Sequence, residues 1–222
     1  MCGRYTLRKP MTVLLTQFAA ELAAGREWGP RYNIPPTASV PAIRAVDGKR
    51  QLSLFHWGLI PSWAKDKNIA YSTINARADT AATKPAFRAA FKSRRCLVLA
   101  DGYYEWQTVG KAKLPWLYEI DGGKPFAFAG LWEAWRPPGA EQSLESCTIL
   151  TTDPSELAAQ HHDRMPVMLD QEDYDAWLSG EQIPLVPFPA ERMTARRVST
   201  FVNSVKNQGP ECVSPLDCPA PE

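Results

Sequence analysis

The sequence predicts one α+β domain built on a strongly curled antiparallel or mixed β-sheet, barrel-like, with flanking helices. Apolar runs of strand length dominate the 222 residues, and helical patterns occur among them without a regular βαβ alternation. No linker of distinct composition divides the chain, and 45% of its residues are hydrophobic, enough to bury a core. We expect the domain to span residues 1–209, followed by a Pro-rich tail at residues 210–222.

The amino-terminal part opens with a helix expected at residues 9–25. Pro10 suits its first turn, Gly25 suits its stop, and the apolar residues between them share one face. A Pro-Pro pair then holds residues 31–37 extended, which predicts a loop. Apolar runs flank the Asp-Gly pair at residues 47–48, and this pattern predicts a β-hairpin.

The middle of the chain contains a segment with little periodicity, residues 61–80, which predicts a long loop. A loop of that length in a compact domain is often functional. The second half of residues 79–95 has a helical pattern. The predicted strands share β-branched or aromatic apolar runs bounded by turn residues. They are residues 40–46, 51–60, 96–100, 114–120, 125–135, 147–152 and 165–169. A Gly-containing break after residue 100 is followed by an aromatic segment at residues 103–107.

Two further helices are predicted near the carboxyl-terminal end. The first covers residues 153–162, with Asp153 as N-cap, Pro154 at the first helical position and Glu156 placed for a capping box. The second covers residues 170–180 and is ended by its terminal glycine.

The charge balance does not indicate a nucleic-acid partner by itself. The formal net charge is +1, so any nucleic-acid binding must depend on a local patch rather than on a global basic field. No apolar stretch is long enough for a transmembrane helix, and the first residues lack the apolar core of a signal peptide. We therefore expect a cytoplasmic monomer with no membrane contact.

The five cysteines are odd in number and widely spread, which is typical of a reducing compartment rather than of a disulfide scaffold. Cys212 and Cys218 could be joined by His161 and His162 around a zinc ion, but this spacing fits no common zinc site. We expect no metal and no organic cofactor.

Cys2 is the most unusual residue of the chain. Cysteine is commonly a buried, inert residue, whereas chain ends are commonly exposed. Removal of Met1, which is usual before a small residue, leaves Cys2 with a free α-amine and a thiol on adjacent carbons. Their ordinary pKa values are about 7.7–8.0 and about 8.5. Such a residue can attack an acyl carbon through sulfur, or condense with an aldehyde through the amine and close a five-membered thiazolidine ring.

Six segments occur in an order that resembles the SOS-response-associated peptidase (SRAP) family, the abasic-site processing proteins. The resemblance runs from Cys2 to about residue 209. The segments are MCGRYTL, RYNIPPT, WGLIPSWAKD, INARADT, ADGYYEW and HHDRMPVML. The resemblance implies that Cys2 forms a thiazolidine crosslink with abasic sites in single-stranded DNA. The open-chain sugar of such a site is an aldehyde, in agreement with the chemistry of a terminal cysteine.

The resemblance also implies three polar partners for Cys2. Glu105 resembles the family's catalytic acid, and a pKa raised beside Tyr104 and Trp106 would suit proton transfer. His162 precedes Asp-Arg as the family's histidine does and has a ring suited to proton exchange. Asn75 resembles the asparagine that orients the terminal amine, and its side chain binds without titrating.

Several residues are expected to contact DNA. Arg4 is close in sequence to Cys2, and Arg77 points to the same side as Asn75 if this stretch is extended; both guanidinium groups suit phosphate. The adjacent Asp163 and Arg164 are expected to form a structural ion pair rather than to catalyse.

Aromatic residues supply the second kind of expected DNA contact, base stacking. Trp57, Trp63 and Trp106 are candidates, and Trp63 is favoured as the exposed one because it lies in a polar loop with Lys65 and Lys67. Four further residues match family positions that line the DNA site. They are Asn33, Pro35, Pro36 and Thr151.

Three other functions remain open at the level of the sequence. Class II glutamine amidotransferases also begin with Met-Cys-Gly and use the cysteine for acyl transfer, but this chain lacks their RGPD-like and NGEIYN-like motifs. A non-covalent binder of single-stranded DNA is disfavoured by the near-neutral charge. Peptidase activity can mean that Cys2, Asn75 and Glu105 remove Met1 from the chain itself. We expect abasic-site capture in the cytoplasm, with nucleoid association once DNA is bound.

Overall fold

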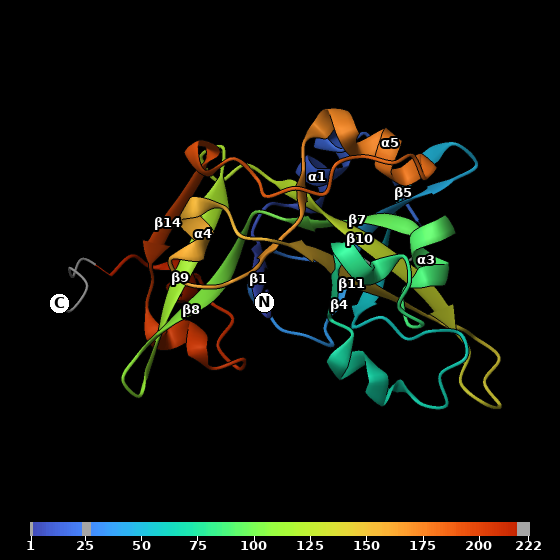
Figure 1. The fold of residues 1–222 in the computed structure, drawn as a ribbon, viewed down its shortest axis with the longest axis horizontal. Helices are drawn as coiled ribbons and strands as arrows, with labels where there is room; N and C mark the ends of the chain where they lie inside the picture. The colour runs from blue at the N-terminus through green and yellow to red at the C-terminus, as the bar shows by residue number, and fades with distance from the viewer. Residues whose placement is uncertain (1, 24–27, 217–222) are drawn as a thin grey trace.

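A computed structural model of the chain describes residues 2–23 and 28–216 and confirms the α+β class in one barrel-like domain (Figure 1). Five strands pair in a closed ring, because the last strand returns to the first by parallel pairing of Ser146 with His56 and of Cys147 with Trp57. In pairing order they are β11 (Leu144–Thr152), β10 (Phe126–Trp135), β7 (Arg95–Ala100), β4 (Ser39–Val46) and β5 (Lys49–Trp57).

Short strands extend this barrel at its rims. They are β2 (Glu21–Leu22) beside β5, β6 (Asn75–Arg77) and β12 (Met165–Pro166) beside β11, and β13 (Met168–Leu169) beside β10. The predicted hairpin between β4 and β5 is confirmed. Asp47 and Gly48 both have positive φ, 49° and 76°, as a two-residue turn with the twist of its flanking strands requires.

A second, five-stranded sheet packs beside the barrel and carries the amino terminus of the described chain (Figure 1). Its strands, in order, are β14 (Met193–Arg197), β9 (Ala112–Ile120), β8 (Gly102–Val109), β1 (Tyr5–Leu7) and β3 (Arg31–Ile34). Gly102 permits the close approach of β1, because a Cβ on it would lie 3.0 Å from Thr6 Oγ1 and 3.0 Å from a Leu117 methyl carbon. This approach brings the residues before β1 next to β8.

The helices are short and lie at the edges of the sheets. The α-helices are α1 (Met11–Gln17), α2 (Ala78–Ala81), α3 (Arg88–Ser93), α4 (Glu156–Ala159) and α5 (Tyr174–Ser179). The 3₁₀-helices are η1 (Lys67–Ser72), η2 (Gln171–Asp173), η3 (Ala190–Arg192), η4 (Thr200–Asn203) and η5 (Pro210–Val213). No helix among the described residues is long and apolar enough to cross a membrane.

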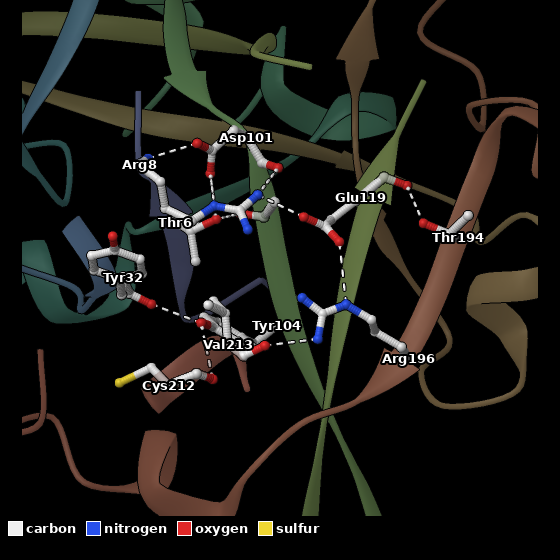
Figure 2. A network of polar contacts seen from close by, with 11 residues as sticks. Thr6, Arg8, Tyr32, Asp101, Tyr104, Glu119, Thr194, Arg196, Cys212 and Val213 are labelled. Carbon is white, nitrogen blue, oxygen red and sulfur yellow. Dashed lines mark hydrogen bonds and ion pairs between the residues drawn. The ribbon is translucent and has the colours of Figure 1, made fainter. Parts of the chain in front are cut away.

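A buried polar network joins β1 to β8, β9 and β14 (Figure 2). Asp101 is fully buried and accepts hydrogen bonds from Thr6 Oγ1 at 2.6 Å and from Arg8 Nε at 3.0 Å. Arg8 also pairs with Glu119 at 2.6 Å, and the same carboxylate accepts from Arg196 Nε at 3.4 Å. Each buried charge thus has a partner, as stability requires. The network holds the turn that precedes β8, and β8 carries Glu105.

The structure corrects the helix predicted at residues 9–25. The helix ends at Gln17, because Ala19 has a left-handed φ of 47° and Phe18 is fully buried, stacked on Tyr174 with ring centroids 5.5 Å apart. Beyond it, β2 pairs with β5 instead of continuing the helix. The stop predicted at Gly25 lies outside the described residues.

Two predicted loops contain regular structure. The stretch 31–37 includes β3, which pairs with β1, so its first four residues belong to the second sheet. The stretch 61–80 contains η1, β6 and the start of α2. The sequence pattern missed β6 because its pairing partner, β11, lies far along the chain, and a three-residue strand has no periodicity of its own.

Two predictions near the carboxyl-terminal end are also corrected. The helix expected at residues 153–162 is the single turn α4, capped by Ser155 rather than by Asp153, because Ser155 Oγ accepts from the Ala158 N–H at 3.4 Å. The strand expected at residues 165–169 is divided between β12 and β13, which pair with different neighbours. Beyond residue 209, Cys212 in η5 is fully buried in a cluster with Tyr104 and Leu117. The helix predicted before Gly180 is confirmed as α5.

Candidate active site

Cys2 is fully buried, contrary to the exposure expected of a residue next to a chain terminus. It precedes β1, and its Sγ–H donates to the Arg4 carbonyl oxygen at 3.8 Å. Burial raises the pKa of the Cys2 thiol well above its usual range, and the nearby charge of Glu105 adds to the rise. The thiol is therefore protonated at neutral pH.

Asn75 holds the backbone of Cys2. It lies on β6, opposite Ile149 of β11, and its Nδ2 donates to the Cys2 carbonyl oxygen at 2.8 Å. The side-chain oxygen of Asn75, Oδ1, is buried and has no hydrogen-bond partner among the described residues. Because an unpaired buried acceptor is costly, this oxygen is available for a further donor beside Cys2.

Glu105 lies on β8, directly opposite Trp116 of β9, and its residue is 6% exposed. Burial raises the pKa of Glu105 to about 7, and the charge of Asp163 contributes to the rise. The raised pKa of Glu105 was expected, but the side chains that surround Glu105 differ from the expected ones. Since side chains alternate along a strand, Glu105 shares its face with Tyr103 and Trp116, whereas Tyr104 and Trp106 pack on the other face in a separate cluster.

His162 follows α4, and its Nδ1 lies 2.8 Å from Asp163 Oδ1 and accepts from the Arg164 backbone N–H at 3.0 Å. Burial lowers the pKa of His162, while the charge of Asp163 acts in the opposite direction. A neutral ring accepts from the Arg164 N–H, and a protonated ring donates to Asp163 instead. The two states of the ring are thus each provided with a partner.

The ion pair expected between Asp163 and Arg164 is not formed. Arg164 lies 3.7 Å from Asp153 Oδ1, and its Nε donates to Thr151 Oγ1 at 3.2 Å. Thr151 is fully buried and faces Arg77 in the register between β11 and β6. Thr151 therefore supports the strand pair that carries Asn75, and its side chain is covered by Arg164.

Arg77 has the orientation that the sequence predicts. In β6 the buried residue is Ala76, so the side chains of Asn75 and Arg77 leave the strand on the same side. The Arg77 side chain is 55% exposed and pairs through two nitrogens with Asp79, at 3.1 and 2.6 Å. A phosphate that binds Arg77 would have to share its guanidinium with the Asp79 carboxylate or displace that carboxylate.

Arg4 is held from three sides. Its Nη1 donates to Asn33 Oδ1 at 2.6 Å and to the Val202 carbonyl oxygen at 3.0 Å. Its Cζ lies 5.5 Å from the ring centroid of Trp106, a cation–π distance. Asn33 is fully buried and also donates to carbonyl oxygens of residues 202–207. Asn33 is therefore a support of Arg4 and not a surface residue.

The remaining expected DNA contacts differ in exposure. Trp57 is fully buried and donates from Nε1 to the Ile74 carbonyl oxygen at 2.9 Å, so it belongs to the core. Trp63 is 60% exposed, as its polar loop predicts. Pro35 and Pro36 are half-buried in the turn between β3 and β4.

The sequence did not single out two other features. Tyr71 is 71% exposed in the same segment as Trp63, and a large aromatic residue within a predicted loop was the available signal. His161 was expected merely to end a helix. Its ring stacks on Trp116 with centroids 4.2 Å apart, and its Nδ1 is hydrogen-bonded to the Tyr118 hydroxyl. This pairing depends on strand register and had no signal in the sequence.

No group of three or more His, Cys, Asp or Glu side chains within residues 2–23 and 28–216 has the arrangement of a metal site. Cys212 is buried in the cluster beside β8, and Cys218 lies outside the described residues.

Comparison with known proteins shows the family of the chain. The family described as SOS response associated peptidase (SRAP) matches residues 1–205. Abasic site processing protein YoqW of Bacillus subtilis is 41% identical over 223 residues, which cover 96% of this chain and 99% of that protein. Abasic site processing protein HMCES of Gallus gallus is 34% identical over 268 residues, which cover all of this chain and 80% of that protein.

A solved structure of a Bacteroides thetaiotaomicron protein superposes with a TM-score of 0.87 at 26% identity, covering 97% of this chain and all of that one. The match extends over both sheets and not only over the barrel. On the family match and on the identity to these relatives, the chain belongs to the SOS response associated peptidase (SRAP) family.

Proposed function

We propose that this protein captures abasic sites in single-stranded DNA as a covalent thiazolidine on Cys2, after removal of Met1, and so protects the lesion during the DNA-damage response. Relatives that match almost the whole chain are named abasic site processing proteins. The observation that carries the proposal is the position of Cys2, clamped through its carbonyl by Asn75 and within the field of Glu105. The protein would act as a cytoplasmic monomer, associated with the nucleoid when bound to DNA.

The chemistry balances without a cofactor. The Cys2 α-amine adds to the C1′ aldehyde of the opened sugar and gives a hemiaminal, which loses water to form a Schiff base. The Sγ–H then adds across the C=N bond: sulfur bonds to carbon and the proton goes to nitrogen. The order amine first, sulfur second suits a thiol whose pKa is raised by burial.

Each polar neighbour has a role in these steps. Glu105, with a pKa of about 7, can donate a proton to the departing hydroxyl group and accept one from the attacking amine at neutral pH. The Oδ1 of Asn75, which is buried and unpartnered among the described residues, would accept a hydrogen bond from the α-amine of Cys2. His162 is neutral at neutral pH, because burial lowers its pKa, and would trade a proton with the ring oxygen of the sugar as it opens.

The DNA strand would contact a surface around this pocket. Arg4 and Arg77 would bind the phosphates that flank the lesion, and the half-buried Trp106, Pro35 and Pro36 would pack against sugar and base. Asn33 and Thr151 are buried, so their contribution would pass through Arg4 and through the β6–β11 pairing.

Two other functions of Cys2 lead to different results. Glutamine hydrolysis by acyl transfer requires a thiolate as first nucleophile, and a buried thiol with a raised pKa is poorly suited to it. Self-removal of Met1 by the Cys2, Asn75 and Glu105 group is compatible with adduct formation, because Met1 would leave before the adduct forms.

The protein is expected to form an adduct that survives denaturing electrophoresis with a uracil-containing single-stranded oligonucleotide treated with uracil glycosylase. The uncleaved uracil oligonucleotide is the control and should give none, because it contains no aldehyde. Absence of a stable adduct would refute the covalent proposal. Cys2-dependent release of ammonia from glutamine would establish the acyl-transfer alternative in its place.

Trp63 and Tyr71 are expected to stack on bases of the bound strand. Their segment is anchored, since Trp135 Nε1 donates to the Ala64 carbonyl oxygen at 2.7 Å and Thr73 Oγ1 to the Leu59 carbonyl oxygen at 2.6 Å, yet it leaves both rings exposed. Stacking contributes about 1–3 kcal/mol per base, so each alanine variant should weaken affinity for undamaged single-stranded DNA by about five- to 150-fold.

Fluorescence anisotropy at several salt concentrations measures this effect. The slope of affinity against salt should stay unchanged, because no phosphate contact is lost. Tyr71→Phe should retain affinity, and Val186→Ala serves as a matched control because Val186 is also exposed, at 58%, but is not aromatic. Equal affinities for Tyr71→Ala and the unchanged protein would remove Tyr71 from the DNA surface.

A further inference from the structure

A groove of about 610 Å³ lies between α3 and the segment that follows α5. Three cationic side chains line it, Arg88, Lys92 and Arg95, and no carboxylate does. The rest of its lining is Ala82, Ala89, Phe91, Gly180 and Gln182. A concave surface lined by one sign of charge concentrates counter-ions of the opposite sign, so the groove is suited to an anion.

Arg95 forms the base of this groove and is an unusual residue. It is only 8% exposed, and among the described residues no carboxylate pairs with it. Its Nε donates to the Phe91 carbonyl oxygen at 3.1 Å, and its Nη1 donates to the Glu181 carbonyl oxygen. Its Cζ lies 4.3 Å from the Trp177 ring centroid. A buried cation held only by neutral groups is costly, and an anionic ligand would offset that cost.

Neighbouring charges do not neutralise the groove. Arg94, the residue before Arg95, already pairs with Glu133 at 2.7 Å. The Glu181 carboxylate accepts from Ser179 Oγ at 3.0 Å and does not line the groove. Burial lowers the pKa of Arg95, but a guanidinium stays charged at neutral pH, so all three lining side chains carry positive charge.

A second hollow lies between the groove and the candidate active site in sequence order. The helix α2 begins directly after Arg77, and this hollow is lined by Ala78, Arg164 and Ile183. Two carboxylates also line it, Asp79, which pairs with Arg77, and Asp153, which lies 3.7 Å from Arg164. Ala82, one helical turn beyond Ala78, lines the basic groove, as does Gln182, the residue before Ile183. The two hollows are therefore lined by neighbouring residues of the same two segments. Figure 1 shows α3 at the opposite end of the molecule from β8 and β9.

We propose that the groove of Arg88, Lys92 and Arg95 binds the phosphate backbone of the DNA strand several nucleotides away from the lesion. The inference rests on the proposed function, since the strand that it would hold is the one whose abasic site lies at Cys2. Lys92 and Arg88 are exposed on α3 and would reach phosphates from the rim, and Arg95 would supply the positive base. The groove would thus set the length of DNA that the protein covers.

The double variant Arg88→Gln/Lys92→Gln tests this role. Both side chains are exposed, and glutamine preserves helix propensity, so the fold should be retained. Oligonucleotides with a central lesion are extended stepwise on the 5′ or the 3′ side, and affinity is measured by anisotropy. The unchanged protein should gain affinity once extension on one side reaches the groove. The double variant should lose that gain, about tenfold, with a salt slope smaller by about 1.4.

The exposed lysines Lys49 and Lys124 line neither hollow, so Lys49→Gln/Lys124→Gln is the charge-matched control and should keep the gain. Adduct yield on the shortest oligonucleotide should be equal in all three proteins. Failure of every protein to form adducts would refute the proposed function alone, because the length dependence can still be measured on undamaged DNA.

The groove proposal would be overturned if the double variant and the unchanged protein gained equally with oligonucleotide length. If, in addition, inorganic phosphate alone raised the Tm of the unchanged protein but not that of the double variant, the groove would be a site for small anions instead.

Discussion

A Cys2→Ala variant is expected to lose the denaturation-resistant adduct completely while keeping the fold. The terminal alanine still has an α-amine, so it can form a Schiff base, but without sulfur the ring cannot close and water reverses the linkage. Addition of borohydride should therefore recover a crosslink in the variant by reducing the Schiff base, whereas the unchanged protein needs no reductant. The measurement is gel mobility after heat and detergent, with and without borohydride.

The internal cysteines provide matched controls. Cys96 and Cys147 are as fully buried as Cys2, but their nitrogens are amides. Alanine at either position should leave adduct yield unchanged, and each substitution should cost about 1 kcal/mol of stability, the usual effect of removing one buried group of this size. A reductant-independent adduct in Cys2→Ala, or its loss in Cys147→Ala alone, would contradict the assignment of Cys2 as nucleophile.

A Glu105→Gln variant is expected to form the adduct 10²–10⁴ times more slowly, the usual range of about two to four orders of magnitude for general acid–base catalysis. Glutamine keeps the shape of the side chain and loses only the titrating proton. The rate of the unchanged protein should change near pH 7, where Glu105 titrates, and the variant should lack that inflection. Single-turnover rates between pH 5 and pH 9 provide the test, with the exposed Glu172→Gln as control.

The same variant should be more stable than the unchanged protein at neutral and alkaline pH. The folded pKa of Glu105 is about 7 and its usual value is 4.5, so the native state binds more protons than the unfolded state between these values. Stability therefore falls as pH rises from 4.5 to 7, and glutamine escapes this loss. The gain should be near zero below pH 4.5 and reach at most on the order of 3 kcal/mol above pH 7.

Denaturant melts at pH 4, pH 6 and pH 8 measure this difference. A gain that is equal at all three pH values would place its origin outside the titration of Glu105. Because Glu105 is also a candidate for removal of Met1, the variant should be prepared with Cys2 exposed by an external protease. Mass spectrometry of the unprocessed variant then answers a separate question: retained Met1 would mean that its removal depends on Glu105.

Local patterns were sufficient for part of the fold. The Asp-Gly hairpin between β4 and β5, the helix that ends before Gly180 and the strands of the barrel follow from turn residues and apolar periodicity. The helix at residues 9–25 was wrong in its second half, because pairing with β5 and the burial of Phe18 outweighed helical periodicity. Such competition between a local preference and a distant partner is not visible in a short window of sequence.

The candidate site shows the same division. An aminothiol at the start of the processed chain, a carboxylate in an aromatic segment and an exposed tryptophan in a polar loop can be identified from residue types and their order, since each has a chemistry of its own. Asn33 could not be distinguished from a surface residue, and its burial under the 202–207 segment depends on contacts between the two ends of the chain.

The sequence by itself determined the fold class and the family and supplied the candidate reactive residue, because these depend on composition, order and the covalent structure of one amino acid. Only the tertiary structure decided that the Cys2 thiol is buried, that Trp116 rather than Trp106 shares the face of Glu105, and that no carboxylate among the described residues pairs with Arg95. Burial and strand register arise from residues that are distant in sequence, and the electrostatic effects that tune a pKa or favour an anion depend on those distances in space.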